Sequence, residues 1–300
     1  MTADAASDTS PAPIAAIDVG SNTTRLLVAR VVGGRVEPLA TGGAMTSLAA
    51  GLRPGGRIGD EGLELVEVTA RQMASEARAL GARVLVVACT AVARTAANAD
   101  ELLARLHRAT GVRARVLSGP DEAALAFRGL VSAGAPDPLL AVDLGGGSLE
   151  VFSGRGGRLR WATSLPIGVR SLTERFAPGD PPAIDLVEPM TAAARELIDP
   201  VVDAPGSADA MAAGGSAAAI AQLAGAERLD RDALVRAVER LAAAPSRDLA
   251  EETGLDPTRV RLSLAGAAIL AAVRRAFALD ALLVTRAGLR EGLVLEAADG

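Results

Sequence analysis

The residues of this chain best suited to chemistry are two carboxylates on either side of a glycine run. Asp143 ends the apolar stretch 139–142, the glycines 145–147 follow, and Glu150 lies on the returning apolar stretch. An ionised carboxylate at the end of an apolar strand is costly unless a cation or a hydrogen-bond donor meets it. Glycines permit positive φ and leave the backbone N–H groups uncovered, and such turns form nests that bind anions. The pattern indicates a phosphate site, and its alternative is an ordinary glycine-rich hairpin in which Asp143 only makes a turn.

The same layout occurs earlier in the chain, around Asp18. The apolar stretch 14–17 precedes this aspartate, one hydrophobic residue and Gly20 follow it, and the small polar residues 21–23 lead into another apolar stretch. Repetition of a whole half-domain is a more specific signal than either turn alone. Two such hairpins facing each other would place two carboxylates and two donor-lined turns around one polyphosphate chain.

These hairpins need rigid elements to hold them, and the hydrophobic pattern predicts alternating strands and helices. Strands are predicted at 14–19, 24–32, 35–41, 83–89 and 112–117, helices at 60–80, 98–110 and 121–132, and a loop at 90–94. From 138 the order restarts, with strands at 138–144, 148–153, 158–164, 208–213 and 281–285, helices between 216 and 276, and a last helix from 288. Alternating strands and helices imply α/β layers.

The repeated order predicts an α/β protein made of two duplicated ribonuclease-H-like domains with a cleft between them. Residues 1–13 are small and polar with two prolines, and we expect a disordered tail there. The turn-rich segment 133–138 marks the boundary between an N-terminal domain, 14–133, and a C-terminal domain, 134–300.

The composition narrows the possible chemistry. All 31 cationic residues apart from histidine are arginine, so the chain has neither a Walker A lysine nor a lysine for Schiff-base chemistry. A net charge of −5 and an aromatic content of 2% argue against binding to long nucleic acid. The single cysteine, Cys89, excludes a disulfide framework and is interpreted as a small buried hydrophobe. The longest apolar run, 264–273, is too short to span a bilayer, and no signal-like segment is found, so we expect a cytoplasmic protein with no membrane partner.

Eight motifs in order resemble one known family. They are D-x-G-S-N-T-x-R-L from Asp18, T-A-x-x-R-x-A-x-N from Thr90, S-G-x-x-E-A from Ser118, D-x-G-G-G-S-x-E from Asp143, S-L-P-x-G from Ser164, T-E-R-F from Thr173, G-G-S from Gly214 and G-L-R-E-G from Gly288. The set resembles the exopolyphosphatase/guanosine pentaphosphate phosphatase (Ppx/GppA) family in its short two-domain form, from Ile14 to about Leu293. The resemblance implies the actin-like, sugar-kinase-like duplicated fold, in agreement with the repeat.

The resemblance also implies an activity. It predicts an exopolyphosphatase that hydrolyses the terminal phosphoanhydride of inorganic polyphosphate and releases orthophosphate. Longer members add helical C-terminal domains, and the chain's ending without them leads us to expect a preference for short polyphosphate. A guanosine pentaphosphate (pppGpp) 5′-phosphatase is the runner-up. A weakly catalytic regulator that binds these nucleotides or polyphosphate, and an ATPase or kinase of the same superfold, remain as further alternatives. A homodimer is expected from the resemblance.

The resemblance assigns catalysis to Glu122. A carboxylate held beside the substrate can take the proton of the attacking water. Glu122 lies in the first turn of the predicted helix, where an acidic residue can instead merely suit the helix dipole. By the same resemblance Asp143, Glu150 and Asp18 hold Mg²⁺ (or Mn²⁺), a hard cation that prefers carboxylate oxygens.

The resemblance assigns phosphate binding to the two glycine turns and to one arginine. The residues concerned are Gly20, Ser21, Asn22, Thr23, Arg94, Gly145, Gly146, Gly147 and Ser148, with a possible phosphate or nucleotide turn in the second domain at Gly214, Gly215 and Ser216. Arg25 is expected either to bind phosphate or to lie solvated on the surface, and Arg290 to be structural. One departure from the family is Arg261, which stands where the family often has an acid.

Overall fold

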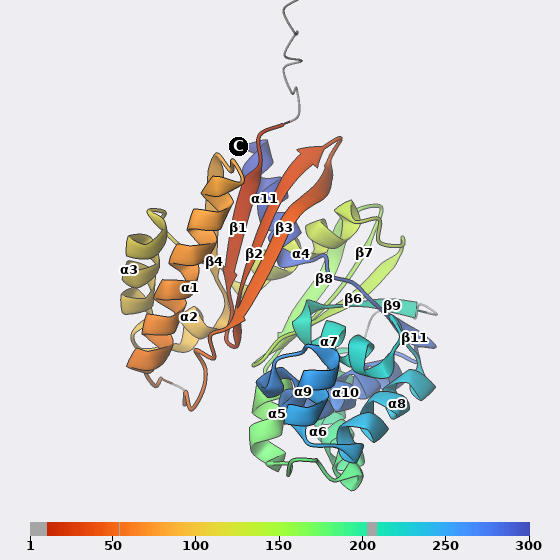
Figure 1. Ribbon diagram of the computed structural model, residues 1–300. Coiled ribbons are helices and arrows are strands. Elements are labelled where there is room, and N and C mark those ends of the chain that lie inside the picture. Colours follow the sequence, from red (N-terminus) through yellow and green to blue (C-terminus); the bar gives the residue numbers. More distant parts are fainter. Residues whose placement is uncertain (1–10, 54, 203–208) are drawn as a thin grey trace, which may run out of the picture.

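The protein contains two mixed β-sheets with helices packed on their faces (Figure 1). The computed structural model describes residues 11–53, 55–202 and 209–300. The predicted tail, 1–13, lies outside the described residues except for 11–13. None of the helices in these ranges is both long and apolar enough to cross a membrane. The predicted α/β fold with duplicated halves is confirmed.

The first sheet has the strand order β3-β2-β1-β4-β5. Its strands are β1 (Ile14–Val19), β2 (Thr23–Val32), β3 (Arg35–Met45), β4 (Val84–Cys89) and β5 (Arg115–Val116). β2 pairs antiparallel with β1 and β3, whereas β4 pairs parallel with β1 and β5. Helices α1 (Asp60–Ala79) and α3 (Ala99–Thr110) pack on one face, where their leucines share a core with Ile17 and Leu26.

The second sheet, of order β10-β11-β9-β6-β7-β8, repeats this arrangement. Its strands are β6 (Leu139–Leu144), β7 (Leu149–Arg155), β8 (Arg158–Leu165), β9 (Asp209–Ala213), β10 (Arg228–Leu229) and β11 (Ala281–Val284). As β2 does in the first sheet, β7 lies between two strands, β6 and β8, and pairs antiparallel with both. β6 pairs parallel with β9. The position of β1 in the first sheet therefore corresponds to that of β6 in the second.

The helices of the second half form a layer around α10. They are α5 (Val169–Phe176), α6 (Val187–Ile198), α7 (Gly214–Ala224), α8 (Arg231–Ala243), α9 (Ser246–Thr253) and α10 (Pro257–Ala276). α10 packs against each of the other five, and most of its residues are buried. A helix that is apolar on nearly all sides is stable only when surrounded in this way.

Two helices, α4 (Gly119–Ser132) and α11 (Leu289–Asp299), lie between the sheets and share a core with both. Glycines allow the two helices to pack closely. A Cβ at Gly129 of α4 would overlap the backbone of Gly288, and one at Gly292 would overlap that of Leu125. Although α11 comes from the C-terminal end of the chain, it packs on β1 and β2 of the first sheet. This interlocking fixes α4, whose first turn carries Glu122.

Two local predictions were wrong. Residues predicted as a loop at 90–94 form the short helix α2 (Ala91–Thr95), in which the Thr95 hydroxyl donates to the carbonyl of Ala91 at 3.1 Å. Five residues are too few to show a helical hydrophobic period. The strand predicted at 112–117 is reduced to Arg115–Val116. The helix α2 holds Arg94 in its last turn.

Candidate active site

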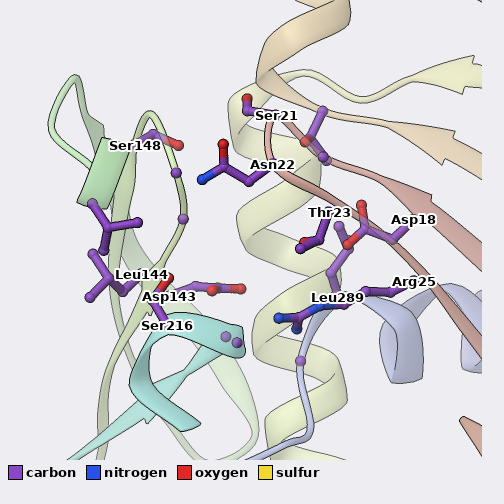
Figure 2. A pocket seen from close by; sticks show the side chains of 18 of the residues that line it. Asp18, Ser21, Asn22, Thr23, Arg25, Asp143, Leu144, Ser148, Ser216 and Leu289 are labelled. Atoms are coloured by element: carbon purple, nitrogen blue, oxygen red, sulfur yellow. The ribbon is translucent and has the colours of Figure 1, made fainter. Parts of the chain in front are cut away.

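A cleft of about 1030 Å³, counting the solvent at its mouth, lies where the turns of the two hairpins face each other (Figure 2). All residues predicted for the site line it except Arg94: Asp18, Gly20, Ser21, Asn22, Thr23, Glu122, Asp143, Gly145, Gly146, Gly147, Ser148, Glu150, Gly214, Gly215 and Ser216. Figure 2 shows Asp18 and Asp143 reaching into the cleft from opposite sides. The structure thus brings together two halves of a site that are far apart in sequence.

The two turns have the same backbone hydrogen bond. The amide of Gly20 donates to the carbonyl of Thr23 at 3.0 Å, and the amide of Gly145 donates to the carbonyl of Ser148 at 3.0 Å. The Gly145 amide, predicted to bind phosphate, is therefore already satisfied. In the described ranges no acceptor is found for the amides of Ser21, Asn22, Gly146, Gly147 and Ser148. Each turn thus leaves uncovered backbone donors at the cleft, the arrangement of an anion nest.

The glycines of the second turn serve close packing rather than unusual backbone angles. None of residues 145–147 adopts the positive φ that glycine permits. A Cβ at Gly146 would instead overlap the side-chain amide of Asn22 from the facing turn. Gly214 is the position near the cleft that does need φ freedom, because its φ is +94° and a Cβ there would lie 2.5 Å from Asp143 Oδ1.

Strand register gives each aspartate a different neighbour. Asp18 is opposite Arg25 across β1 and β2, whereas Asp143 is opposite Glu150 across β6 and β7. Glu150 is buried and accepts a hydrogen bond from the Ser164 hydroxyl at 2.8 Å. The second hairpin consequently presents two carboxylates side by side, and the first presents a carboxylate beside a cation.

Burial raises the pKa of the three hairpin carboxylates, those of Asp18, Asp143 and Glu150. Burial lifts the pKa of Asp18 to about 6, although Arg25 and Arg290 lower it. Burial also raises the pKa of Asp143, and burial together with the nearby Asp143 raises that of Glu150. The Oδ1 atom of Asp18 is buried and has no hydrogen-bond partner in the described part of the chain. Such an unpaired oxygen is costly unless a ligand meets it.

Glu122 lies at the start of α4 with only 14% of its side chain exposed. Burial and then the nearby Glu150 raise its pKa to about 8, while Arg94 lowers it. Arg94 Nη1 donates to Glu122 Oε2 at 2.7 Å and to the carbonyl of Leu117 at 2.8 Å. The phosphate-binding role predicted for Arg94 stays a prediction, and in the structure its guanidinium contacts Glu122. A carboxylate with this pKa, in reach of a cleft, is suited to accept a proton near neutral pH.

Four arginines also line the cleft, namely Arg25, Arg259, Arg286 and Arg290. A Cβ at Gly215 would overlap the guanidinium groups of both Arg25 and Arg259, which come from opposite halves of the chain. Burial, and then the nearby Arg290 and Arg259, lower the pKa of Arg25. Arg290 donates to the carbonyl of Leu26 at 3.0 Å, a structural contact as predicted, but it also lines the cleft. Such gathered cations favour an anionic ligand.

Sequence reasoning missed Arg259 and Arg286 as cleft residues. Arg259 lies in the first turn of α10, three residues after the capping Asp256. Its place at a helix start could have marked Arg259 as a cleft residue. The departure noted at Arg261 concerns a different place, since Arg261 is exposed and lines a small separate depression.

The carboxylates of the cleft offer oxygen ligands for a metal ion. The described ranges contain no group of three or more His, Cys, Asp or Glu side chains arranged to hold one alone. The unpaired Oδ1 of Asp18 and the adjacent Asp143 and Glu150 nevertheless offer hard oxygen donors. They fit a divalent cation that completes its coordination with water and phosphate oxygens, as Mg²⁺ commonly does.

Comparison with known proteins points to one family. The model of the Ppx/GppA phosphatase family matches residues 27–299. Exopolyphosphatase 1 of Mycobacterium tuberculosis is 33% identical over 307 aligned positions, covering 94% of this chain and 87% of that protein. The solved PPX-GPPA enzyme of Aquifex aeolicus is 26% identical with a TM-score of 0.78, over 95% of this chain and 99% of that one. An exopolyphosphatase from Cytophaga hutchinsonii, 22% identical with a TM-score of 0.85 over 96% and 98% of the two chains, shares the fold.

Proposed function

Since this chain belongs to the Ppx/GppA phosphatase family, we propose that it is an exopolyphosphatase that hydrolyses the terminal phosphoanhydride of inorganic polyphosphate. The observation that carries the proposal is the position of Glu122, whose buried carboxylate meets a cleft between two turns with uncovered amides. Curated relatives at 33% and 32% identity bear the name exopolyphosphatase, which supports this substrate over a nucleotide.

In this proposal Glu122 takes a proton from a water molecule as the water oxygen attacks the terminal phosphorus. The bond between that phosphorus and the bridging oxygen breaks, so orthophosphate and a chain shorter by one phosphate are released. Arg94 holds the Glu122 carboxylate through its 2.7 Å hydrogen bond and favours its ionised form. General-base assistance of this kind contributes a factor of about 10² to 10⁴ in rate.

Phosphate oxygens are held by donors from both halves. The uncovered amides of Ser21, Asn22, Gly146 and Gly147 serve the terminal groups. Arg25 and Arg259 meet the following part of the chain. We propose that Asp143, Glu150 and Asp18 hold Mg²⁺ or Mn²⁺, which when bound would offset charge on the phosphate oxygens and on the leaving phosphate.

The test is a measurement of orthophosphate release from tripolyphosphate, from longer polyphosphate, from guanosine pentaphosphate and from ATP, each with Mg²⁺ or Mn²⁺. We expect polyphosphate to have the highest kcat/KM, and the comparison of lengths tests the expected preference for short chains. A higher kcat/KM for guanosine pentaphosphate would move the assignment to the alternative phosphatase activity. Tight binding of these ligands with no turnover would make the protein a regulator.

A further inference from the structure

Helix α5 begins directly on the glycine turn of the second hairpin. The amide of Val169 donates to the carbonyl of Gly145 at 3.1 Å, and the amide of Arg170 donates to that of Gly146 at 2.8 Å. A Cβ at Gly168 would overlap the backbone of Gly146. The carbonyls of the turn therefore face α5, and the position of Arg170 is fixed relative to the turn.

The side chain of Arg170 crosses to the first hairpin. Its Nε donates to Oδ1 of Asn22, and its Nη2 donates to the Ser47 hydroxyl at 3.4 Å. The backbone carbonyl of Asn22 accepts bonds from the amides of Thr46 and Ser47, both at 2.9 Å. Asn22 is only 8% exposed, so both its backbone and its side-chain oxygen are held in place.

This contact decides which end of the Asn22 amide meets the cleft. A carboxamide has an accepting oxygen and a donating nitrogen, and a guanidinium can only donate. The oxygen must therefore face Arg170, which turns Nδ2 toward the glycine turn, as Figure 2 shows. Among the described residues Nδ2 has no acceptor, and Asn22 lines the cleft whereas Arg170 does not. A reversed amide would present an oxygen lone pair to a phosphate oxygen and repel it.

We propose that Arg170 is a positioning residue that holds the Asn22 side chain with its nitrogen toward the cleft, so that Asn22 donates to a phosphate oxygen of the substrate. The substrate in this inference rests on the proposed function, but the orientation of the amide does not. Because Arg170 belongs to the second half and Asn22 to the first, the donor is correctly set only when the two halves are in contact.

The sequence offers a direct spectroscopic test, because the chain has only two asparagines, Asn22 and Asn98. Selective ¹⁵N-asparagine labelling therefore gives two pairs of side-chain amide signals. Asn98 is an internal control, since its side chain bonds to the backbone of Ile58 at 2.8 and 3.1 Å. In Arg170→Leu we expect the Asn22 pair to move and broaden while the Asn98 pair stays. In the wild type, tripolyphosphate without divalent metal is expected to shift only the Asn22 pair.

Arg175→Leu is the matched control, since Arg175 lies on the same helix but is exposed and contacts the Phe176 ring. It should leave both signal pairs unchanged. Arg170→Lys keeps a donor and should leave the Asn22 signals closer to those of the wild type than Arg170→Leu does. Movement of the Asn98 pair would reveal misfolding of Arg170→Leu, and Arg170→Met, which keeps a long side chain without a donor, would then take its place. Unchanged Asn22 signals in the Arg170 variants would overturn the proposal.

Kinetics with tripolyphosphate supply a second readout. Because a donor to a ground-state phosphate oxygen contributes to binding, Arg170→Leu should raise KM about tenfold with kcat within about twofold of wild type. Asn22→Ala should do the same, and the double variant should be no worse than Asn22→Ala alone, since both changes remove one interaction. Additive effects would show that Arg170 acts independently of Asn22. A wild type that releases no phosphate would defeat the proposed function, while the NMR result would still decide the role of Arg170.

Discussion

The two hairpins that face each other across the cleft share a backbone and differ in charge. Each has an aspartate at the end of its first strand and a turn closed by the same 3.0 Å hydrogen bond. Opposite the aspartate, the first hairpin carries Arg25 and the second carries Glu150. The duplicated backbone thus supplies two similar turns, and a single register position places a cation beside the first aspartate and a second carboxylate beside the other.

The turns differ in a complementary way. In the first, Ser21 and Asn22 contribute side chains, and in the second, Gly146 contributes bare backbone that packs against Asn22. The side chains of the first turn occupy the space that the glycines of the second turn leave free. Glu122, the proposed base, is influenced more by the second hairpin, because Glu150 raises its pKa more than Asp18 does.

The largest predicted effect follows from that position of Glu122. Glu122→Gln keeps the shape of the side chain but cannot accept the proton, so kcat should fall by about 10³-fold or more. The Kd of tripolyphosphate, measured by calorimetry, should remain within about threefold of wild type. The proton transfer occurs in the transition state, so its loss does not weaken binding of the ground state.

The neighbouring Asp121 is the control for this variant. Asp121 lies in the same turn of α4, but it is exposed and accepts a 2.6 Å bond from the Ser118 hydroxyl. Asp121→Asn should keep most of the activity. Near-normal turnover by Glu122→Gln would show that the base is elsewhere and would remove the functional difference between the hairpins.

The second prediction compares the two aspartates. Asp143→Asn should raise the Mg²⁺ concentration for half-maximal phosphate release at least about tenfold, as loss of residues that support metal sites does. Asp18→Asn should have a smaller effect on this concentration, because its register neighbour is the cation Arg25 rather than Glu150. Equal effects of the two variants would mean that the hairpins contribute equally to the metal requirement.

The third prediction concerns the cation of the first hairpin. In the proposed function, Arg25→Gln removes a charge-assisted hydrogen bond to phosphate, so KM for tripolyphosphate should rise about tenfold, a larger change than any in the Mg²⁺ requirement. Arg261→Gln is the control, since Arg261 is exposed and lines a separate depression. A change in metal requirement without a change in KM would reverse the roles assigned to the two hairpins.

Much of this arrangement was predictable because its signals are local. The hairpins, their carboxylates and the duplicated order appear as short motifs with the period of strands, and the structure confirms the duplicated fold. What the sequence did not give were contacts between distant residues. Arg94 meets Glu122 across 28 positions, and Arg170 meets Asn22 across 148. In the sequence, an arginine near a phosphate motif predicts a phosphate ligand. Only the fold shows that Arg94 contacts the carboxylate of Glu122.

The last and smallest predicted effect tests that difference. Arg94→Gln removes the charge and weakens the hydrogen bond that lower the pKa of Glu122, so this pKa should rise above about 8. The reaction needs the ionised carboxylate, and its activity is lost as pH falls through this pKa. The acid limb of kcat/KM should therefore move to higher pH, by about half a unit to one unit, which is a few-fold loss at neutral pH.

At a pH well above the limb, the Arg94→Gln variant should approach the wild-type rate, because Glu122 is then ionised in both proteins. The phosphate-binding role predicted from the sequence makes the opposite forecast, namely a raised KM at every pH. A pH series of kcat and KM therefore separates the two roles of Arg94. If KM were raised throughout and the limb did not move, Arg94 would belong with the phosphate donors, and Glu122 would depend on its burial and on Glu150 alone.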